Sequence, residues 1–303
     1  MDNLKKIAFI YIVNSSSGLY NVVRAILSLI DKSKINQAVK KKIPFVLIYQ
    51  QGRVASTSVY ESIKAIKLPY PLYHVHTISA KTAQKGIEKL KQKKGKIYRH
   101  FFVGKFLSQA LIQKRKEPQA PPWKIITIFR DPLEVMLSLH FLNMSNKKLF
   151  VSEGGQLDNE MALRHYETLF INDEPAGWEI CKWFDEVFLD ETGVDVYLTP
   201  FDYEKGYTII NAQECDILII KFEDIKKAYK YGVAELFDIN PADVELQHAN
   251  LHSNDDYKDI HKYVKQNLKF SSEFCDKVYS TKLIKHFYSP QQILNLKNKW
   301  GEK

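Results

Sequence analysis

An arginine and three hydroxyl residues follow a short apolar run in the first part of this chain. Residues Phe45 to Tyr49 are apolar and β-rich, and Gln50-Gln-Gly-Arg-Val-Ala-Ser-Thr-Ser-Val59 comes directly after them. An amphipathic segment then continues to Ile66. This order predicts a strand, a tight turn and the first turn of a helix, where unpaired backbone N–H groups and the helix dipole attract anions. The segment is therefore suited to chemistry on a phosphate-like group.

The residue types of the turn fit anion binding individually. Gly52 allows a turn that most residues resist, and Arg53 brings a permanent positive charge. The three hydroxyl residues can cap the helix and donate hydrogen bonds to an anion. An ordinary capped helix after a buried strand would show the same pattern, so this segment alone leaves both interpretations open. The candidate anion-binding residues are Gly52, Arg53, Val54, Ala55, Ser56, Thr57 and Ser58.

A second candidate site follows another predicted strand, Lys124 to Phe129. Arg130 ends this strand, and Asp131 and Pro132 are suited to the N-cap and first position of a helix. Ser138 would lie about two turns into that helix. Ligands of open α/β sheets bind beyond the carboxyl ends of the strands, where Arg130 is expected. The alternative is that Arg130 pairs with Asp131 and that Ser138 faces solvent.

Together, the two segments resemble the sulfotransferase superfamily, whose members transfer sulfuryl groups from 3′-phosphoadenosine 5′-phosphosulfate (PAPS). The first is similar to that family's 5′-phosphosulfate loop, commonly Lys-x-(Ala/Gly)-Ser-Thr-Ser, which stands here as Arg53-Val-Ala-Ser-Thr-Ser58. The second is similar to its 3′-phosphate site, an arginine followed by a serine, here Arg130 and Ser138. Asp216-Ile-Leu-Ile-Ile-Lys-Phe-Glu-Asp224 resembles the late strand of the same superfamily that ends in Glu-Asp.

From Pro44 onward the chain is similar to bacterial proteins labelled "putative capsular polysaccharide synthesis protein", a sulfotransferase-like group. The resemblance implies a P-loop-like three-layer α/β fold, with a mainly parallel sheet flanked by helices. It also implies PAPS as co-substrate and a carbohydrate hydroxyl as acceptor, on a surface or capsular polysaccharide or its precursor. The segments shared with that group are Tyr73-His-Val-His76, Val196-Tyr-Leu-Thr-Pro-Phe201 and Lys285-His-Phe-Tyr-Ser289.

Two departures from the family pattern affect the expected chemistry. Arg53 replaces the usual lysine, and arginine can stabilise charge on a leaving oxygen but cannot act as a proton donor. The Arg-Lys-Gly segment that covers the nucleotide in the cytosolic enzymes is absent. The contacts to adenine and ribose are therefore unassigned.

The expected reaction also needs a base that accepts the proton of the attacking hydroxyl. Histidine suits this role at neutral pH, and an aligned base contributes roughly 10²–10⁴ in rate. His74 and His76 share one face of a predicted strand, and His76 is nearer its carboxyl end. We expect His76 to be the base, with His74 as second candidate and Arg53 as electrostatic partner. His140 is a weaker candidate for the base, His165 in the candidate insertion could touch the substrate, and no metal is required.

Strands alternating with helices predict a mainly parallel sheet in a single α/β domain over residues 1–303. Segment 150–176 is the candidate insertion or lid, and residues 255–303 are expected to be mostly helical. Glu223 and Asp224 are expected to cap the following helix, although they could instead orient an acceptor or a basic side chain. Further strands are expected at Leu72–His76 and Ile97–Val103, and helices at Ala80–Lys91, Asn159–Phe170 and Gly177–Asp190.

Composition sets further limits. The chain has 303 residues, of which 45% are hydrophobic, so it can bury a large core. Its formal net charge of +9 favours an anionic partner such as a nucleotide or an acidic glycan. The lysines are scattered, and no zinc-finger, RNP-like or helix-turn-helix signature is present, so nucleic acid is not the expected partner.

The cysteines and the first residues bear on location. Cys181, Cys215 and Cys275 show neither metal-binding spacing nor a disulfide framework, which favours a reducing cytoplasm. The apolar run Ile7 to Val13 is too short to span a bilayer. Residues 1–35 are expected to pack on the core, the alternative being a membrane surface. The expected location is cytoplasmic, with at most a peripheral contact at the inner face of the membrane.

Two rival functions remain open from the sequence. A P-loop kinase shares the strand, loop and helix start, but Gly-x-x-x-x-Gly-Lys-(Ser/Thr) is absent from residues 47–60. A magnesium requirement with ATP would favour that rival. A non-catalytic glycan- or protein-binding assembly factor would bind PAPS without transfer, and Arg53 in place of lysine is the feature that supports it.

Overall fold

The computed structural model describes residues 17–117, 119–144, 150, 158–170, 178–247 and 258–302. The chain divides into two compact units, which are treated separately below. Unit 1 comprises Met1–Gln50, Ile63–Thr127 and Asn211–Leu218. Unit 2 comprises Gln51–Ser62, Ile128–Ile210 and Ile219–Lys303.

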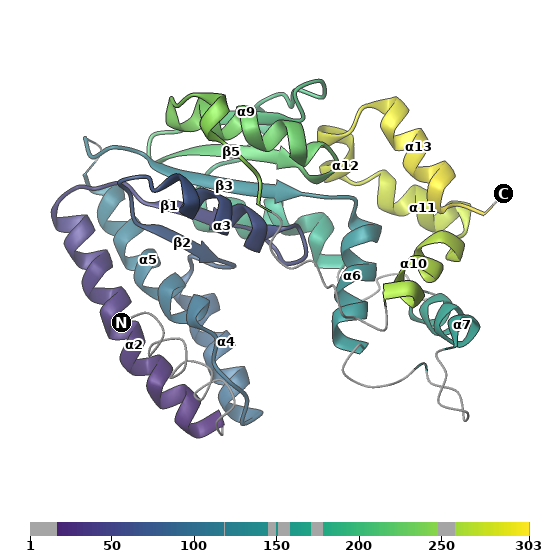
Figure 1. The fold of residues 1–303 in the computed structure, drawn as a ribbon, viewed down its shortest axis with the longest axis horizontal. Coiled ribbons are helices and arrows are strands. Elements are labelled where there is room, and N and C mark those ends of the chain that lie inside the picture. The colour runs from purple at the N-terminus through teal and green to yellow at the C-terminus, as the bar shows by residue number, and fades with distance from the viewer. Residues whose placement is uncertain are drawn as a thin grey trace. The chain divides into compact units, whose positions relative to one another are not determined.

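The protein is α/β, with a five-stranded sheet in the order β2-β1-β3-β5-β4. The strands are β1 (Val46–Tyr49), β2 (Leu72–Val75), β3 (Trp123–Phe129), β4 (Tyr207–Asn211) and β5 (Cys215–Lys221) (Figure 1). β1 pairs in parallel with both β2 and β3, so that Ile48 lies opposite His74 on one side and Ile126 on the other.

β5 and β4 complete the sheet. The Trp123 N–H donates to Glu214 O, which joins the starts of β3 and β5 and makes them parallel. β4 reaches β5 through a short turn, and the Ala212 N–H donates to Cys215 O, so this edge strand runs antiparallel. The sequence prediction of a mainly parallel sheet is confirmed, with one antiparallel strand added at the edge.

Among the described residues, unit 1 contains the helices α2 (Ser17–Lys40), α4 (Ala80–Gln92) and α5 (Arg99–Arg115). α5 contacts both α2 and α4, and it also contacts β2 (Figure 1). The strand expected at Ile97–Val103 is wrong, because most of that apolar run forms the first turns of α5. Gly104 on this helix approaches Thr77 so closely that a Cβ would lie 2.3 Å from the Thr77 carbonyl oxygen.

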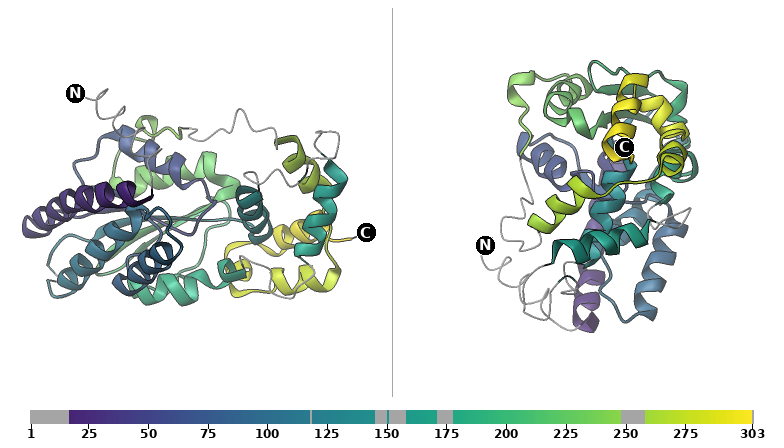
Figure 2. Two further views of the ribbon diagram at one scale, coloured as in Figure 1. Left: turned by 90° about the horizontal axis from the view of Figure 1, so that it is seen from below. Right: turned by 90° about the vertical axis from the view of Figure 1, so that its right-hand side faces the viewer.

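Unit 2 begins with the first turns of α3 (Ser56–Ile66) and is mostly helical. α10 contacts α7, and α12 contacts both α11 and α13, so these helices form one group (Figure 2). The helices expected at 159–170 and over 255–303 are confirmed within the described residues. The remaining helices are α6 (Pro132–Met144), α7 (Asn159–Leu169), α9 (Ile225–Phe237), α10 (Lys258–Asn267), α11 (Ser272–Tyr279), α12 (Lys282–Phe287) and α13 (Pro290–Trp300).

Several other expectations can be compared with the described residues. Residues 178–192 are helical as predicted, but as a 3₁₀ turn, a π turn and the short helix α8 (Leu189–Thr192). Of the candidate lid at 150–176, the structure describes residues 150 and 158–170. The other residues of this segment lie outside the described residues, as do residues 1–16. Within the part of the chain that the structure describes, no helix combines the length and apolar character needed to cross a membrane.

Packing between aromatic rings holds the ends of the buried strands in each unit. All four residues of β1 are buried, and in unit 1 the Phe45 ring lies 4.8 Å from the Trp123 ring. In unit 2, the Phe129 ring stacks on Phe287 at 4.2 Å and meets Tyr288 edge-on. Phe129 is the last residue of β3, so this packing holds the point at which the candidate site begins.

Candidate functional site

The loop between β1 and α3 bends at residues other than the glycine. Arg53 and Ala55 have φ angles of 69° and 62°, in the left-handed region that side chains disfavour. Gly52 does not adopt that region, and a Cβ built on it would meet no atom within 4 Å. The expectation that Gly52 makes the tight turn is therefore wrong, because Arg53 and Ala55 carry the unusual backbone conformation.

The hydroxyl residues of this loop lie inside the first turn of α3. The Val59 N–H donates to Ala55 O, which places Ala55 at the N-cap position and Ser56, Thr57 and Ser58 at the first three helical positions. Helical N–H groups at these positions have no carbonyl partner inside the helix. The Val54 side chain is fully buried, so only its backbone is available to a ligand.

The two segments singled out in the sequence meet in unit 2. Arg53 Nε donates to Ser138 Oγ at 2.8 Å, and Arg130 Nη1 donates to Arg53 O at 3.4 Å. Burial, together with the nearby charge of Arg130, lowers the pKa of Arg53. Two guanidinium groups held close together without an anion repel each other, so bound negative charge would be stabilised here.

Arg130 does not pair with Asp131, so that alternative is wrong. Its Nη2 donates to Glu134 Oε2 at 2.8 Å, and its guanidinium lies 4.2 Å from the Phe222 ring centroid. The ring gives a planar support of the kind that arginine stacks on. The side chain of Arg130 is thus fixed in orientation at the end of β3.

Asp131 is the N-cap of α6, as predicted. Its Oδ1 accepts the Leu133 N–H at 3.1 Å and the Tyr279 hydroxyl at 3.2 Å, while Oδ2 accepts the Trp300 indole N–H at 2.7 Å. Burial raises the pKa of Asp131 to about 6, although the Trp300 hydrogen bond opposes the shift. Through this buried carboxyl, the last helices of the chain are attached to the residue next to Arg130.

Glu134 lies at the centre of three cations that the sequence analysis did not connect. Besides Arg130, Lys265 Nζ lies 2.8 Å and Lys299 Nζ 2.5 Å from Glu134 Oε1. Burial would raise the pKa of Glu134, but the hydrogen bonds from these two lysines and the charge of Arg130 outweigh it and hold the pKa below its usual range. One carboxylate thus faces three positive charges, which leaves an excess of two.

A cavity of ≈ 710 Å³ opens beside this cluster. Its volume falls within the roughly 300–1,000 Å³ of sites that bind small molecules. Of the predicted site residues, Ala55, Ser58 and Arg130 line it. The other charged side chains in its wall are Asp131, Glu134, Glu223, Asp224, Lys226, Lys227, Lys265 and Lys299.

Glu223 and Asp224 do not cap α9, so that prediction is wrong. Asp224 occupies the N-cap position without a side-chain capping bond, and its Oδ2 lies 2.6 Å from Lys221 Nζ. Glu223 accepts the Asp131 N–H at 3.0 Å and the Tyr288 hydroxyl at 3.1 Å. Glu223 therefore connects the ends of β5 and β3 with the segment before α13, whereas Asp224 pairs with Lys221 at the end of β5.

The candidate bases belong to unit 1, where three histidines lie together. The His76 ring is 5.1 Å from His74 and 5.0 Å from His100, which the sequence analysis did not single out. His76 Nδ1 lies 2.8 Å from Gln50 O, so in the neutral ring Nδ1 carries the proton and Nε2 the lone pair. Burial lowers the pKa of all three histidines, to about 4 for His74 and His100.

His140 and His165 belong to unit 2. The His140 ring lies 5.7 Å from Phe170, and the His165 ring 5.6 Å from Phe150, so both take part in aromatic packing. Among the described residues, no group of three or more histidine, cysteine, aspartate and glutamate side chains is placed to hold a metal ion.

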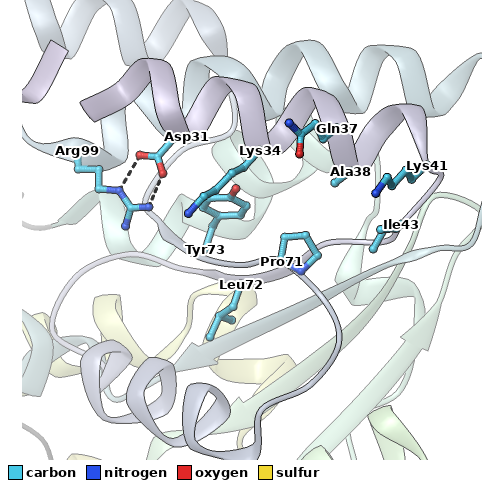
Figure 3. A pocket seen from close by; sticks show the side chains of 10 residues that line it. All are labelled: Asp31, Lys34, Gln37, Ala38, Lys41, Ile43, Pro71, Leu72, Tyr73 and Arg99. Atoms are coloured by element: carbon cyan, nitrogen blue, oxygen red, sulfur yellow. Dashed lines mark hydrogen bonds and ion pairs between the residues drawn. The ribbon is translucent and has the colours of Figure 1, made fainter. Parts of the chain in front are cut away.

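A second cavity, of ≈ 400 Å³, lies in unit 1 beneath α2 (Figure 3). Asp31 and Arg99 lie together at one end of it in a two-bonded ion pair of 2.7 and 2.8 Å. Lys34 and Tyr73 lie beside this pair. None of the predicted phosphate-binding residues lines it, so we assign the candidate site to the ≈ 710 Å³ cavity that Ala55, Ser58 and Arg130 line.

Comparison with known proteins gives one match. Residues 162–289 match a family model described as "putative capsular polysaccharide synthesis protein". The matched part contains Glu223 and Tyr288, whereas Arg53, Arg130 and Ser138 precede it. No curated protein and no solved structure matches the chain.

Proposed function

We propose that this protein is a PAPS-dependent sulfotransferase that moves a sulfuryl group to a carbohydrate hydroxyl. The observation that carries the proposal is the hydrogen bond between Arg53 and Ser138, because it joins the two segments that resemble the phosphate sites of sulfotransferases. Arg130 beside them adds a second guanidinium with a fixed orientation. Two segments that are far apart in the sequence, the loop after β1 and the segment from the end of β3 into α6, thus supply positive charge and hydrogen-bond donors.

The donor would be held by charge and by backbone polarity. The first N–H groups of α3 and the hydroxyls of Ser56 to Ser58 suit the 5′-phosphosulfate. Arg130 and Ser138 suit the 3′-phosphate. A phosphate bound there would also relieve the repulsion between Arg53 and Arg130 and balance the excess charge of the Glu134 cluster. Lys265 and Lys299 are therefore included among the residues that would stabilise the bound nucleotide.

The proposed reaction is a single in-line displacement. The acceptor oxygen forms a bond to sulfur while the bond from sulfur to the bridging phosphate oxygen breaks, which releases adenosine 3′,5′-bisphosphate. Arg53 stabilises the negative charge that develops on the leaving oxygen, and the leaving phosphate departs without a proton from arginine. Positioning and electrostatics supply the catalysis, as in phosphoryl transfer.

The proton of the attacking hydroxyl would pass to His76. Its Nδ1–H is directed to Gln50 O, so Nε2 presents a lone pair when the ring is neutral. Burial lowers the pKa of His76 and keeps the ring neutral at pH 7. His74 is the second candidate, and its pKa of about 4 makes it the weaker base.

The family match and the net charge support the acceptor class. The matched family carries the description "putative capsular polysaccharide synthesis protein", and polysaccharides consist of hydroxyl-bearing sugars. A formal charge of +9 is compatible with an acidic sugar chain. We therefore propose a surface or capsular polysaccharide, or its precursor, as acceptor.

Calorimetric titration with adenosine 3′,5′-bisphosphate, beside ATP and AMP and without metal, tests the donor site. The bisphosphate should bind tightly, and Arg130→Ala should abolish most of that binding. Arg164→Ala is the matched control, because Arg164 is exposed on α7 and should leave the affinity unchanged.

The other outcomes favour the rival functions. Preferential binding of ATP when the titration is repeated with magnesium would support a kinase and refute the proposal. Tight bisphosphate binding without transfer to any polysaccharide hydroxyl would support an assembly factor, for which Arg53 in place of lysine is the supporting feature.

A further inference from the structure

The face that α2 turns toward unit 1 is unusually polar. Ser28 and Asp31 on this face are buried, and Asp31 is paired with Arg99 (Figure 3). Asn21 donates to Gly95 O at 3.0 Å and accepts the Ile97 N–H at 2.7 Å. Tyr20 is also buried, beside Arg24. Polar bonds therefore contribute much of the attachment of the first half of α2.

The opposite face of the same helical turns is apolar and exposed. A surface helix in a water-soluble protein normally places its apolar stripe inward, so α2 has the reverse arrangement here. The residues are spaced so that they share one face, over a length of about 16 Å. They are Leu19 (54% exposed), Val22 (58%), Ile26 (58%), Leu29 (62%) and Ile30 (51%). We call these five residues the α2 apolar face.

A basic turn lies beside the start of α2, on the side of the helix that carries Asn21. The two bonds of Asn21 fix this turn, residues 91–96, beside the start of α2. Lys91, Lys93 and Lys94 in it are exposed, and Lys96 Nζ lies 5.3 Å from the Tyr20 ring centroid. Tyr98, directly after the turn, is 53% exposed. Apolar side chains, lysines and an exposed tyrosine are the combination found on helices that lie in the surface of a bilayer.

We propose that the α2 apolar face and the basic turn dock on the surface of an anionic lipid bilayer. The helix would lie in the plane of the interface, with its apolar side chains among the lipid and the lysines at the anionic headgroups. A second copy of the chain fits less well, because two chains that each carry a net charge of +9 repel each other.

Sedimentation of the full chain with vesicles tests this surface. We expect the protein to bind vesicles of phosphatidylcholine containing about one third phosphatidylglycerol, and to bind phosphatidylcholine alone much less, because the lysines need anionic headgroups. High salt should weaken the binding. The double variant Ile26→Glu, Leu29→Glu should lower the partition coefficient at least about tenfold.

Leu294→Glu is the matched control. Leu294 is 50% exposed on α13, outside the α2 apolar face, and this variant should bind vesicles like the unchanged protein. Thermal melting of each variant shows whether it folds, and Lys91→Glu with Lys94→Glu provides a second disruption that leaves the helix intact.

Three results would overturn the proposal. The first is absence of binding to the anionic vesicles at low salt. The second is equal vesicle binding by the unchanged protein and both disrupted variants. The third is a dimer in light scattering that the Ile26→Glu, Leu29→Glu variant dissociates while vesicles bind neither protein, which would assign the face to a second copy.

Discussion

Arg53 and Ser138 are 85 positions apart in the sequence, and their side chains share a hydrogen bond of 2.8 Å. The bond joins the loop after β1 to the second turn of α6. Arg130 also donates a hydrogen bond to the Arg53 backbone. A substitution at any of the three residues should therefore alter the orientation of the other two.

Removal of the Ser138 hydroxyl should weaken nucleotide binding more than folding. Ser138→Ala deletes an acceptor for Arg53 and a donor for the proposed 3′-phosphate. We expect the affinity for adenosine 3′,5′-bisphosphate to fall about tenfold and the free energy of unfolding to fall by about 1 kcal/mol. Calorimetry and urea denaturation measure the two quantities. An unchanged affinity would limit Ser138 to holding Arg53.

Glu134→Gln should tighten anion binding while it lowers stability. The carboxylate competes with a bound phosphate for Arg130, Lys265 and Lys299, so its loss should increase bisphosphate affinity about tenfold. The same change leaves three cations without their shared partner and should cost about 1–3 kcal/mol of folding free energy.

Two comparisons make the Glu134 result specific. Glu179→Gln changes the net charge equally at an exposed position and should alter neither quantity. Lys265→Met and Lys299→Met should each weaken bisphosphate binding. Weaker binding by Glu134→Gln would show that the carboxylate organises the cations for the ligand rather than competing with it.

Neither the Ala55→Gly substitution nor the reverse change, Gly52→Ala, should lower the free energy of unfolding. Ala55 has a φ of 62°, so Ala55→Gly should relieve strain and raise the free energy of unfolding by about 1 kcal/mol. Gly52 needs no glycine conformation and has open space around it, so Gly52→Ala should be neutral or stabilise by about 0.4–1 kcal/mol. Urea denaturation of both variants is the measurement, and a strongly destabilised Gly52→Ala would contradict the loop geometry.

The histidine cluster should make the protein sensitive to acid. His74 and His100 have folded pKa values of about 4 against an ordinary value of 6.5, so the unfolded chain binds more protons between these limits. The stability they contribute is present above pH 6.5 and is lost as the pH falls toward 4. At pH 5, unfolding of the unchanged protein should therefore take up roughly two more protons than unfolding of the His74→Gln, His100→Gln variant.

Asp131 acts in the opposite direction in part of the same range. Its folded pKa of about 6 lies above the ordinary value of 3.8, so its contribution to stability is present below pH 3.8 and is lost as the pH rises through 6. The difference between unchanged protein and variant isolates the histidines from this opposing effect. Equal pH dependence of the two proteins would contradict the burial of the cluster.

Local pattern was sufficient for β1, β2 and β3. These strands were each predicted within about one residue at either end, because short apolar strands bounded by polar turns leave a clear signal. The edge strand β4 was not predicted, and β5 was expected only from the resemblance, three residues too long at its end. Parallel pairing of β1 with both neighbours then followed from the alternation with helices. The same argument failed at Ile97–Val103. There the apolar run continues at helical spacing through Leu107 and Leu111, which a short window does not include.

The rest of the site depends on contacts that no local pattern contains. Glu134 could have been found, since it lies one helical turn after Arg130. Lys265 and Lys299 reach the same carboxylate from helices far along the chain, where many lysines look alike. The tight turn was expected at Gly52, because glycine is the residue type that adopts unusual backbone conformations most easily. In the structure Arg53 and Ala55 adopt the left-handed conformation instead.

The buried hydrogen bond between Trp300 and Asp131 has a consequence for how the molecule is made. The two residues are 169 positions apart. During synthesis, Asp131 at the N-cap of α6 therefore cannot accept this hydrogen bond until the ribosome has added Trp300, much later. Lys299 reaches the Glu134 cluster at the same late moment. The strands can pair while the chain is still growing, but the cation cluster at their exit is completed only after Trp300 has been added. Nascent chains interrupted before that residue would carry the loop and helix motifs without a finished anion site.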